Sequence, residues 1–153
     1  MAYLPGMSEF QASDYASELL DILTEGDELH GRAVLKGIEG SRITANVAFS
    51  TGLDKSQWLE VVVAFSDTIT GTSAYVSSKY SIVDGVVSLP KLYFVSALQG
   101  SGNIERLNKL GYPADAVLER MIPRMPKQFH QPIARGLQVL QKLEIGLKAK
   151  FES

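Results

Sequence analysis

The sequence predicts an α+β protein: an antiparallel sheet of about five to six strands flanked by an N-terminal amphipathic helix and C-terminal helices. Three observations predict this class. A helical apolar period opens the chain, strand-like segments fill residues 32–98, and helical patterns fill most of residues 102–151. The 153 residues include 45% hydrophobic and 21% charged side chains, as in ordinary globular proteins. We therefore expect a single globular domain over residues 1–153.

The first expected helix spans residues 9–25. Ser8 and Gln11 match a capping box, and Gly26 is a natural helix stop. Alanine and leucine side chains gather on one side of this helix at 100° per residue. The opposite side carries an acidic stripe, made of Asp14, Glu18, Asp21 and Glu25.

The strand block contains segments of two kinds. Residues 42–49 alternate between apolar and polar side chains, which predicts a half-buried strand, and residues 33–38 are its expected hairpin partner. Residues 58–65 and 92–98 are apolar at nearly every position, so both of their faces need covering. A single layer of helices covers only one face of a sheet.

The segment between the two apolar strands is rich in hydroxyl side chains. We expect residues 66–81 to form a solvated hairpin that turns near residues 70–71. The Asp-Gly dipeptide at 84–85 predicts a turn into a short strand at 86–89. Pro90 then has to lie at an edge or a bulge, because it cannot donate a ladder hydrogen bond.

Helices are expected after the sheet ends at Gly100. A short one, capped by Ser101 or Asn103, would close at Gly111. A second would begin at Pro113.

Pro123 would end that second helix, and a third would begin at Pro132. The apolar stripe of this last helix contains Ile133, Leu137, Leu140, Leu147 and Phe151. Glu144 interrupts this stripe, so it either pairs with Lys148 at the surface or meets a polar partner.

Charge is segregated along the chain. Residues 1–101 carry a net charge of −6 and residues 102–153 a net charge of +4, which together give −2. Residues 120–143 contain no acidic side chain. This basic window offers a surface for an anion or a partner protein through Arg120, Arg124, Lys127, His130 and Arg135. The pI of 5.7 argues against a dedicated nucleic-acid binder.

Two interpretations of the acidic stripe stay open. It is either a solvated helix face or a surface that docks against basic groups of a neighbouring molecule. Like charges along one helix face cost about 0.2–0.5 kcal/mol per pair, so a compensating partner is plausible.

Signatures of catalysis and metal binding are absent from the sequence. Without cysteine there is no disulfide, thiolate nucleophile or zinc-thiolate site. The glycine-containing turn at 99–103 lacks the spacing of a dinucleotide or phosphate loop and is interpreted as a turn with a helix cap. His30 and His130 have no carboxylate, serine or second histidine at a spacing that indicates a relay or a metal site. We expect no catalytic residue, metal or cofactor.

The sequence also bears on location. The first basic side chain is Arg32, and no apolar run approaches the ~20 residues that cross a bilayer. We expect a soluble, cytoplasmic protein with no membrane partner.

Three hypotheses about function follow. The favoured one is a non-enzymatic assembly or protein-protein interaction subunit, homo-oligomeric or part of a larger particle such as a virion. The second is a binding module for nucleic acid, or for a small anionic or apolar ligand. The third is a small enzyme on an unrecognised scaffold, with His30 or His130 as its base.

Overall fold

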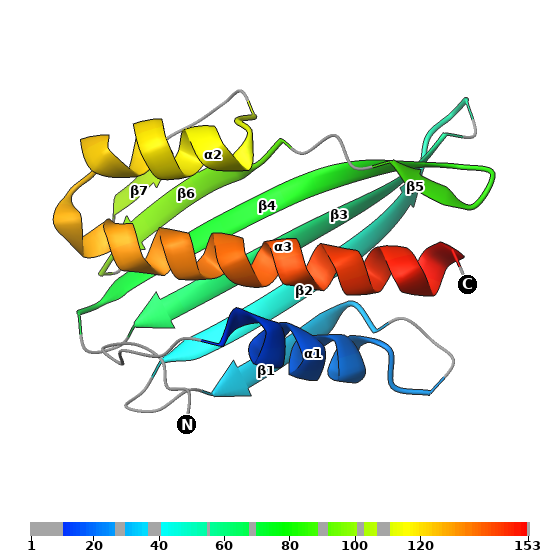
Figure 1. The fold of residues 1–153 in the computed structure, drawn as a ribbon, viewed down its shortest axis with the longest axis horizontal. Coiled ribbons are helices and arrows are strands. Elements are labelled where there is room, and N and C mark those ends of the chain that lie inside the picture. The colour runs from blue at the N-terminus through cyan, green and yellow to red at the C-terminus, as the bar shows by residue number, and fades with distance from the viewer. Residues whose placement is uncertain are drawn as a thin grey trace.

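The computed structural model describes residues 11–26, 30–36, 41–54, 56–67, 70–88, 92–100, 103–106 and 111–152. One antiparallel sheet forms a layer, and the helices lie together on one of its faces (Figure 1). This arrangement confirms the α+β class expected from the sequence, including the N-terminal helix and the C-terminal helices.

The sheet contains seven described strands, one more than the upper end of the expected number. Six of them follow the order β1-β2-β3-β4-β6-β7, and β5 pairs with β4 beside this path. The strands are β1 (Arg32–Lys36), β2 (Arg42–Thr51), β3 (Gln57–Asp67), β4 (Thr72–Val83), β5 (Val86–Ser88), β6 (Phe94–Gln99) and β7 (Asn103–Arg106).

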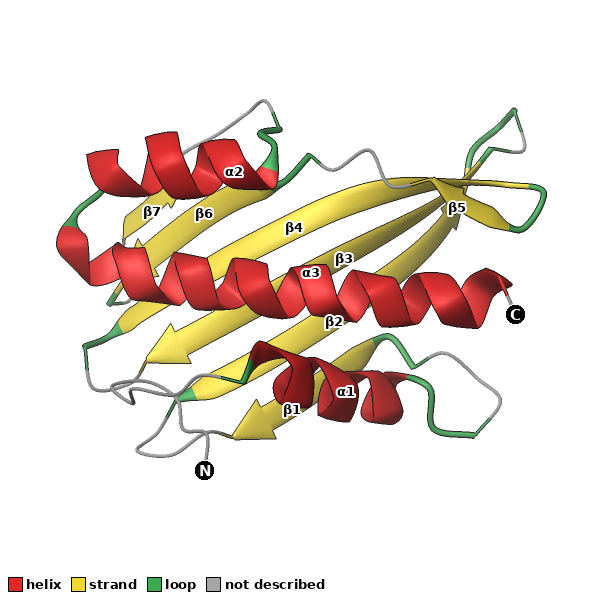
Figure 2. Cartoon of the chain, viewed as in Figure 1, coloured by secondary structure: helices red, strands yellow, loops and turns green. Residues whose placement is uncertain are grey.

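Three helical regions cover the sheet (Figure 2). Helix α1 spans Ala12–Leu23, and the long helix α3 spans His130–Glu152. Between β7 and α3, the chain forms a short helix α2 (Ala114–Ala116) that continues as a π-helical turn η2 (Val117–Met121) and a 3₁₀ turn η3 (Ile122–Arg124). A second 3₁₀ turn, η4 (Lys127–Phe129), leads into α3.

The core lies between the sheet and α3. Leu137 and Leu140 of α3 are fully buried, as are Phe65 of β3 and Val76 of β4. Helix α3 packs directly on the sheet at Gly136, where an added Cβ would lie in van der Waals contact, 3.4 Å from Val76 Cγ2. Helix α1 fills the space beside α3 and buries Leu19 and Leu23, as its apolar period predicts.

Strand β4 corrects the expectation of a solvated hairpin at residues 66–81. The turn near residues 70–71 is present, but β4 pairs with both β3 and β6. Alternate side chains of β4 are buried against the helices, among them Ala74 and Tyr80. Most of the hydroxyl groups of β4 lie on the other face of the sheet and alternate with its apolar residues. Because the hydroxyl groups are so numerous, the sequence suggested a solvated segment instead of a strand of the sheet.

Two further expectations about the C-terminal third were wrong. Residues Asn103–Arg106 form β7 on the edge of the sheet instead of a short helix, because pairing with β6 satisfies their backbone groups. Helix α3 begins at His130, two residues before Pro132. Proline is tolerated there because the first N–H groups of a helix have no partner within the helix.

Some expectations fall outside the described residues. Ser8 of the capping box, Pro90 and the helix-capping Ser101 lie outside the described ranges, and nothing is described of the side chain of Phe151. That the chain forms a single domain stays a prediction. Within the described part of the chain, no helix is both long and apolar enough to cross a membrane.

Candidate functional site

The two faces of the sheet differ in what covers them. Odd-numbered positions of β2 and β3 and even-numbered positions of β4 point toward α1 and α3, and this inner face is mostly buried. Figure 1 shows α1, α2 and α3 on the same side of the sheet. No helix or strand in the described ranges lies over the outer face.

The outer face combines apolar and hydroxyl side chains. At its centre Val62 pairs with Ser77, and Ala64 pairs with Tyr75. Tyr75 is 37% exposed, and Trp58 near the end of β3 is 41% exposed. The outer positions of β3, β4 and β6 therefore resemble the centre of an interface more than an ordinary solvated surface.

Charge is scarce on this outer face. Among its described positions on β3, β4 and β6, the only charged residues are Glu60 and Lys79, whose side chains lie 3.8 Å apart. Arg32, Lys36 and Arg42 lie toward the β1 edge. Glu60 and Lys79 form an opposite-charge pair beside the centre of the face, so the described positions of β3, β4 and β6 carry no net charge on this side.

A buried polar cluster lies on the inner face beneath α3. The hydroxyl of Tyr93 donates to Glu144 Oε1 at 2.7 Å, and the hydroxyl of Tyr80 donates to Glu144 Oε2. Ser78 Oγ forms a hydrogen bond with the Tyr80 hydroxyl. Glu144 is only 7% exposed. The polar partner expected as one alternative for Glu144 is therefore a pair of tyrosines.

Lys148 instead contacts the backbone of β5 and the side chain of Glu152. Its ammonium group donates to the carbonyl of Val87 at 2.9 Å. The surface pairing of Lys148 with Glu144, the other alternative, is absent.

The cluster shifts the pKa values of both tyrosine hydroxyl groups. Burial, together with the nearby Glu144 carboxylate, raises the pKa of Tyr80 and the pKa of Tyr93 above their ordinary value. A cleft of about 360 Å³ opens beside Tyr93 and Glu144 and is also lined by Gln141 and Asp115. The cluster is chiefly a means of fixing α3 over β4 and β6, because its hydroxyls already have their acceptors.

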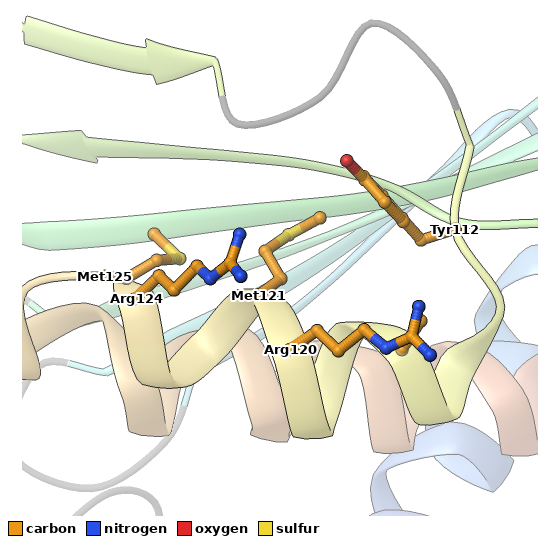
Figure 3. Close-up of a pocket in the computed structure, with 6 residues that line it drawn as sticks. Tyr112, Arg120, Met121, Arg124 and Met125 are labelled. Atoms are coloured by element: carbon orange, nitrogen blue, oxygen red, sulfur yellow. The ribbon is translucent and has the colours of Figure 1, made fainter.

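A second cleft lies beside the helical segment that precedes α3. Its volume is about 380 Å³. Figure 3 shows Arg124 and Met121 projecting from this segment on the side of Tyr112, whereas the side chain of Arg120 runs along the helix away from Arg124. The residues that line it are Tyr112, Ala116, Arg120, Met121, Arg124 and Met125.

Only part of the expected basic window meets at this cleft. Arg120 and Arg124 line it together. Lys127 is exposed on η4, and the ring of His130 is directed to the carbonyl of Met125, with Nε2 2.9 Å from that oxygen. Arg135 lies in α3, where burial lowers its pKa.

The acidic stripe is exposed on α1 and its C-terminal end, as expected. Helix α1 and the segment that carries Arg120 and Arg124 lie on opposite sides of α3 (Figure 1). The two charged regions therefore do not pair within one chain. None of the four acidic side chains has an ion-pair partner among the described residues.

Neither histidine occupies a relay. His30 Nε2 lies 2.8 Å from the carbonyl of Glu25, and His130 likewise contacts a backbone carbonyl. The described hydrogen-bond partners of these rings include no carboxylate, hydroxyl or second histidine. Within the described ranges, no group of three or more His, Asp or Glu side chains could hold a metal ion. The geometry adds no support to the enzyme hypothesis.

Sequence reasoning did not find the roles of Tyr80, Tyr93 and Tyr112. The interruption of the apolar stripe by Glu144 signalled a buried polar partner but not which one. Tyr80 of β4 and Tyr93, which directly precedes β6, are 64 and 51 residues from Glu144 in sequence, so their meeting depends on the sheet order.

Comparisons with known proteins assign no family. No protein-family model, no curated protein and no solved structure matches the chain.

Proposed function

We propose that the protein is a non-enzymatic assembly subunit that pairs with a second copy of itself through the outer face of its sheet. The observation that carries this proposal is the charge-poor outer face of β3, β4 and β6, over which none of the described helices or strands lies. Trp58 and Tyr75 on this face are each more than one third exposed in the single chain. Exposed apolar patches of this kind mark interaction sites.

The size of the face suits a dimer. With the neighbouring β2 included, four strands at about 4.8 Å spacing give a width of about 19 Å, and roughly eight residues at about 3.3 Å give a length of about 26 Å. The projected area is thus about 500 Å², before side-chain relief is added. A standard interface buries about 800 Å² on each partner.

The composition also suits a second copy. On the β3, β4 and β6 part of the face the charges of Glu60 and Lys79 cancel, so this part can meet itself without the like-charge repulsion that a two-fold interface would otherwise impose. Two sheets can stack about 10 Å apart with small rotation, and the alternation of Ser and Thr with larger side chains lets the two surfaces interdigitate. Isologous pairing of outer faces would leave the helices on the outside of the dimer.

Light scattering at several protein concentrations tests the proposal. We expect twice the mass of one chain at micromolar concentration, and loss of the dimer in Tyr75→Lys, because a lysine at the centre of a dry interface would be buried unpaired. A monodisperse monomer of the unmodified protein would overturn the proposal.

A matched pair of variants controls for the added charge. Val83 on the outer face and Ile145 on the solvent side of α3 are each 62% exposed. We expect Val83→Lys to weaken the dimer and Ile145→Lys to leave it unchanged. Equal effects of the two variants would indicate that general charge, not the outer face, controls association.

The proposal includes a cytoplasmic location and a role in a larger particle, as expected from the sequence. These finer statements rest on composition and charge alone.

A further inference from the structure

We propose that the cleft lined by Arg120 and Arg124 binds a small amphipathic anion, a carboxylate with a short alkyl or aryl body. The guanidinium group of Arg124 would hold the carboxylate, Arg120 would add positive charge at the rim, and the body would lie against Met121, Met125 and Tyr112. This inference concerns the helical side of the molecule and does not depend on pairing through the outer face of the sheet.

The first argument is the unsatisfied positive charge. Neither Arg120 nor Arg124 forms an ion pair or a hydrogen bond with any of the described side chains or backbone groups. Both are exposed and border the same cleft. A guanidinium group presents a rigid fork of donors that matches a carboxylate, and a second positive charge at the same cleft adds to the attraction of an anion.

The second argument is the apolar floor beside these charges. Met121 is 9% exposed and Met125 is 6% exposed, so their side chains already form a dry surface under the cleft. Methionine adapts its shape to an apolar guest, since its unbranched side chain has three rotatable bonds. The volume of about 380 Å³ lies within the range of about 300–1,000 Å³ that is typical of small-molecule pockets.

The third argument is the local backbone. The π-helical turn η2 carries Arg120 and Met121, and such widened turns are rare and frequent at functional sites. Pro123 explains the departure from a regular helix, because it cannot donate to the carbonyl of Glu119 and its ring would crowd that oxygen. Arg120 and Arg124 are four residues apart across η2 and η3, and both border the cleft.

A small anion fits this site better than a nucleic acid. Asp115 and Glu119 are exposed on the same helical segment, so a long phosphate backbone would meet negative charge beside the arginines. Tyr112 is the only aromatic side chain in the described lining of the cleft, whereas single-stranded nucleic acid stacks on several. The apolar floor would also contribute nothing to phosphate binding.

Three small molecules separate the contribution of the anionic head group to binding from that of the apolar body. Octanoate supplies both, octanol supplies only the body, and inorganic phosphate supplies only an anion. Ligand-observed NMR or calorimetry with the full chain should show that octanoate binds with a dissociation constant of about 1 mM or lower, and that octanol and phosphate bind at least tenfold more weakly.

Variants of the basic window locate the site. Arg124→Gln should weaken octanoate binding at least tenfold, because one fork of charge-assisted hydrogen bonds is lost. Lys127→Gln removes the same charge three residues away, outside the described lining of the cleft, and should leave binding within about twofold. Both side chains are exposed, and an unfolding curve for each variant confirms that it folds.

The remaining outcomes would overturn the inference. Equal binding of octanoate and octanol would indicate an apolar pocket without anion recognition. Equal loss in Arg124→Gln and Lys127→Gln would indicate only diffuse electrostatic attraction. Tight binding of a short RNA, lost equally in both variants, would indicate a nucleic-acid surface. No octanoate binding at several millimolar would also contradict it.

Discussion

Single side chains under α3 determine how firmly that helix is fixed. Glu144 accepts hydrogen bonds from the hydroxyls of Tyr80 and Tyr93 in a buried environment. Glu144→Leu should lower the free energy of unfolding by about 1–3 kcal/mol for each hydroxyl left without an acceptor. Glu144→Gln keeps an acceptor and should lower it less. Urea unfolding of both variants measures these differences.

A combined variant separates the hydrogen bonds from general packing. If the loss arises from orphaned hydroxyls, adding Tyr80→Phe and Tyr93→Phe to Glu144→Leu should restore much of the stability, because both partners are then apolar. A Glu144→Leu protein as stable as the unmodified chain would contradict the role assigned to this cluster.

Tyr80 and Tyr93 should also make the stability of the protein depend on pH in the alkaline range. Burial raises the pKa of Tyr80 and of Tyr93 above the ordinary value of 10.0. The contribution of the two tyrosines to the free energy of unfolding is therefore fully present below pH 10 and is lost as the pH rises beyond it. The reason is that the phenol protons are released more readily in the unfolded chain than in the folded one. Near-ultraviolet absorbance should show at least two of the six tyrosines ionising only as the protein unfolds. Ionisation of all six while the chain stays folded would contradict this.

Helix α3 depends on close approach to the sheet at one position. A Cβ at Gly136 would lie 3.4 Å from Val76 Cγ2 and 3.9 Å from Phe65 Cβ. Gly136→Ala should be tolerated, because this contact is tight but the helix gains about 0.5–1 kcal/mol from losing a glycine. Gly136→Val should destabilise by about 1–3 kcal/mol through overpacking. Thermal unfolding compares the Gly136→Ala and Gly136→Val variants. Equal melting temperatures would contradict the contact of α3 with the sheet at this position.

Among the helices and strands, those with a clear apolar period were predicted from the sequence, whereas β4 and β7, whose sequences also fitted another conformation, were not. Residues 42–49 and the α1 stripe follow simple periods, so their strand and helix were predicted correctly. Strand β4 was obscured because its polar residues occupy the outer face. Strand β7 was missed because four residues carry little periodic signal, and its partner β6 decides their conformation.

The candidate sites were predictable only in part, for a similar reason. An acid-free window identified Arg120 and Arg124, since charge is visible in sequence. The apolar floor at Met121 and Met125 was not predicted, because their burial depends on how this segment packs on the rest of the fold. The outer face was anticipated from the doubly apolar residues 58–65, but which side the helices would cover depends on the whole fold.

For the whole molecule, opposite charges on opposite sides of α3 allow a second contact between copies. The acidic stripe of one copy can meet the basic residues beside α2 of another. Such a head-to-tail contact leaves one free surface of each kind at the ends, so further copies can add instead of the assembly closing as a dimer. Combined with pairing through outer faces, it would convert dimers into larger assemblies.

This second contact should be sensitive to salt, whereas pairing through the outer faces should not. Exposed charges are screened beyond about 8 Å at 0.15 M ionic strength, so rising salt should reduce larger assemblies to dimers. Glu18→Lys with Asp21→Lys should have the same effect at low salt. Adding Arg124→Glu and Lys127→Glu should partly restore the larger species. Each exposed pair contributes only about 0–1 kcal/mol, so several must act together.

Light scattering across a salt series measures both contacts at once. The double reversal on α1 should leave the melting temperature nearly unchanged, because Leu19 and Leu23 hold α1 to the core on its opposite side. It should also leave the dimer intact, whereas Tyr75→Lys should abolish the dimer at every salt concentration. If the reversals alter neither the size of the assemblies nor their salt dependence, the acidic stripe is a solvated helix face, and only the outer face of the sheet joins one copy to another.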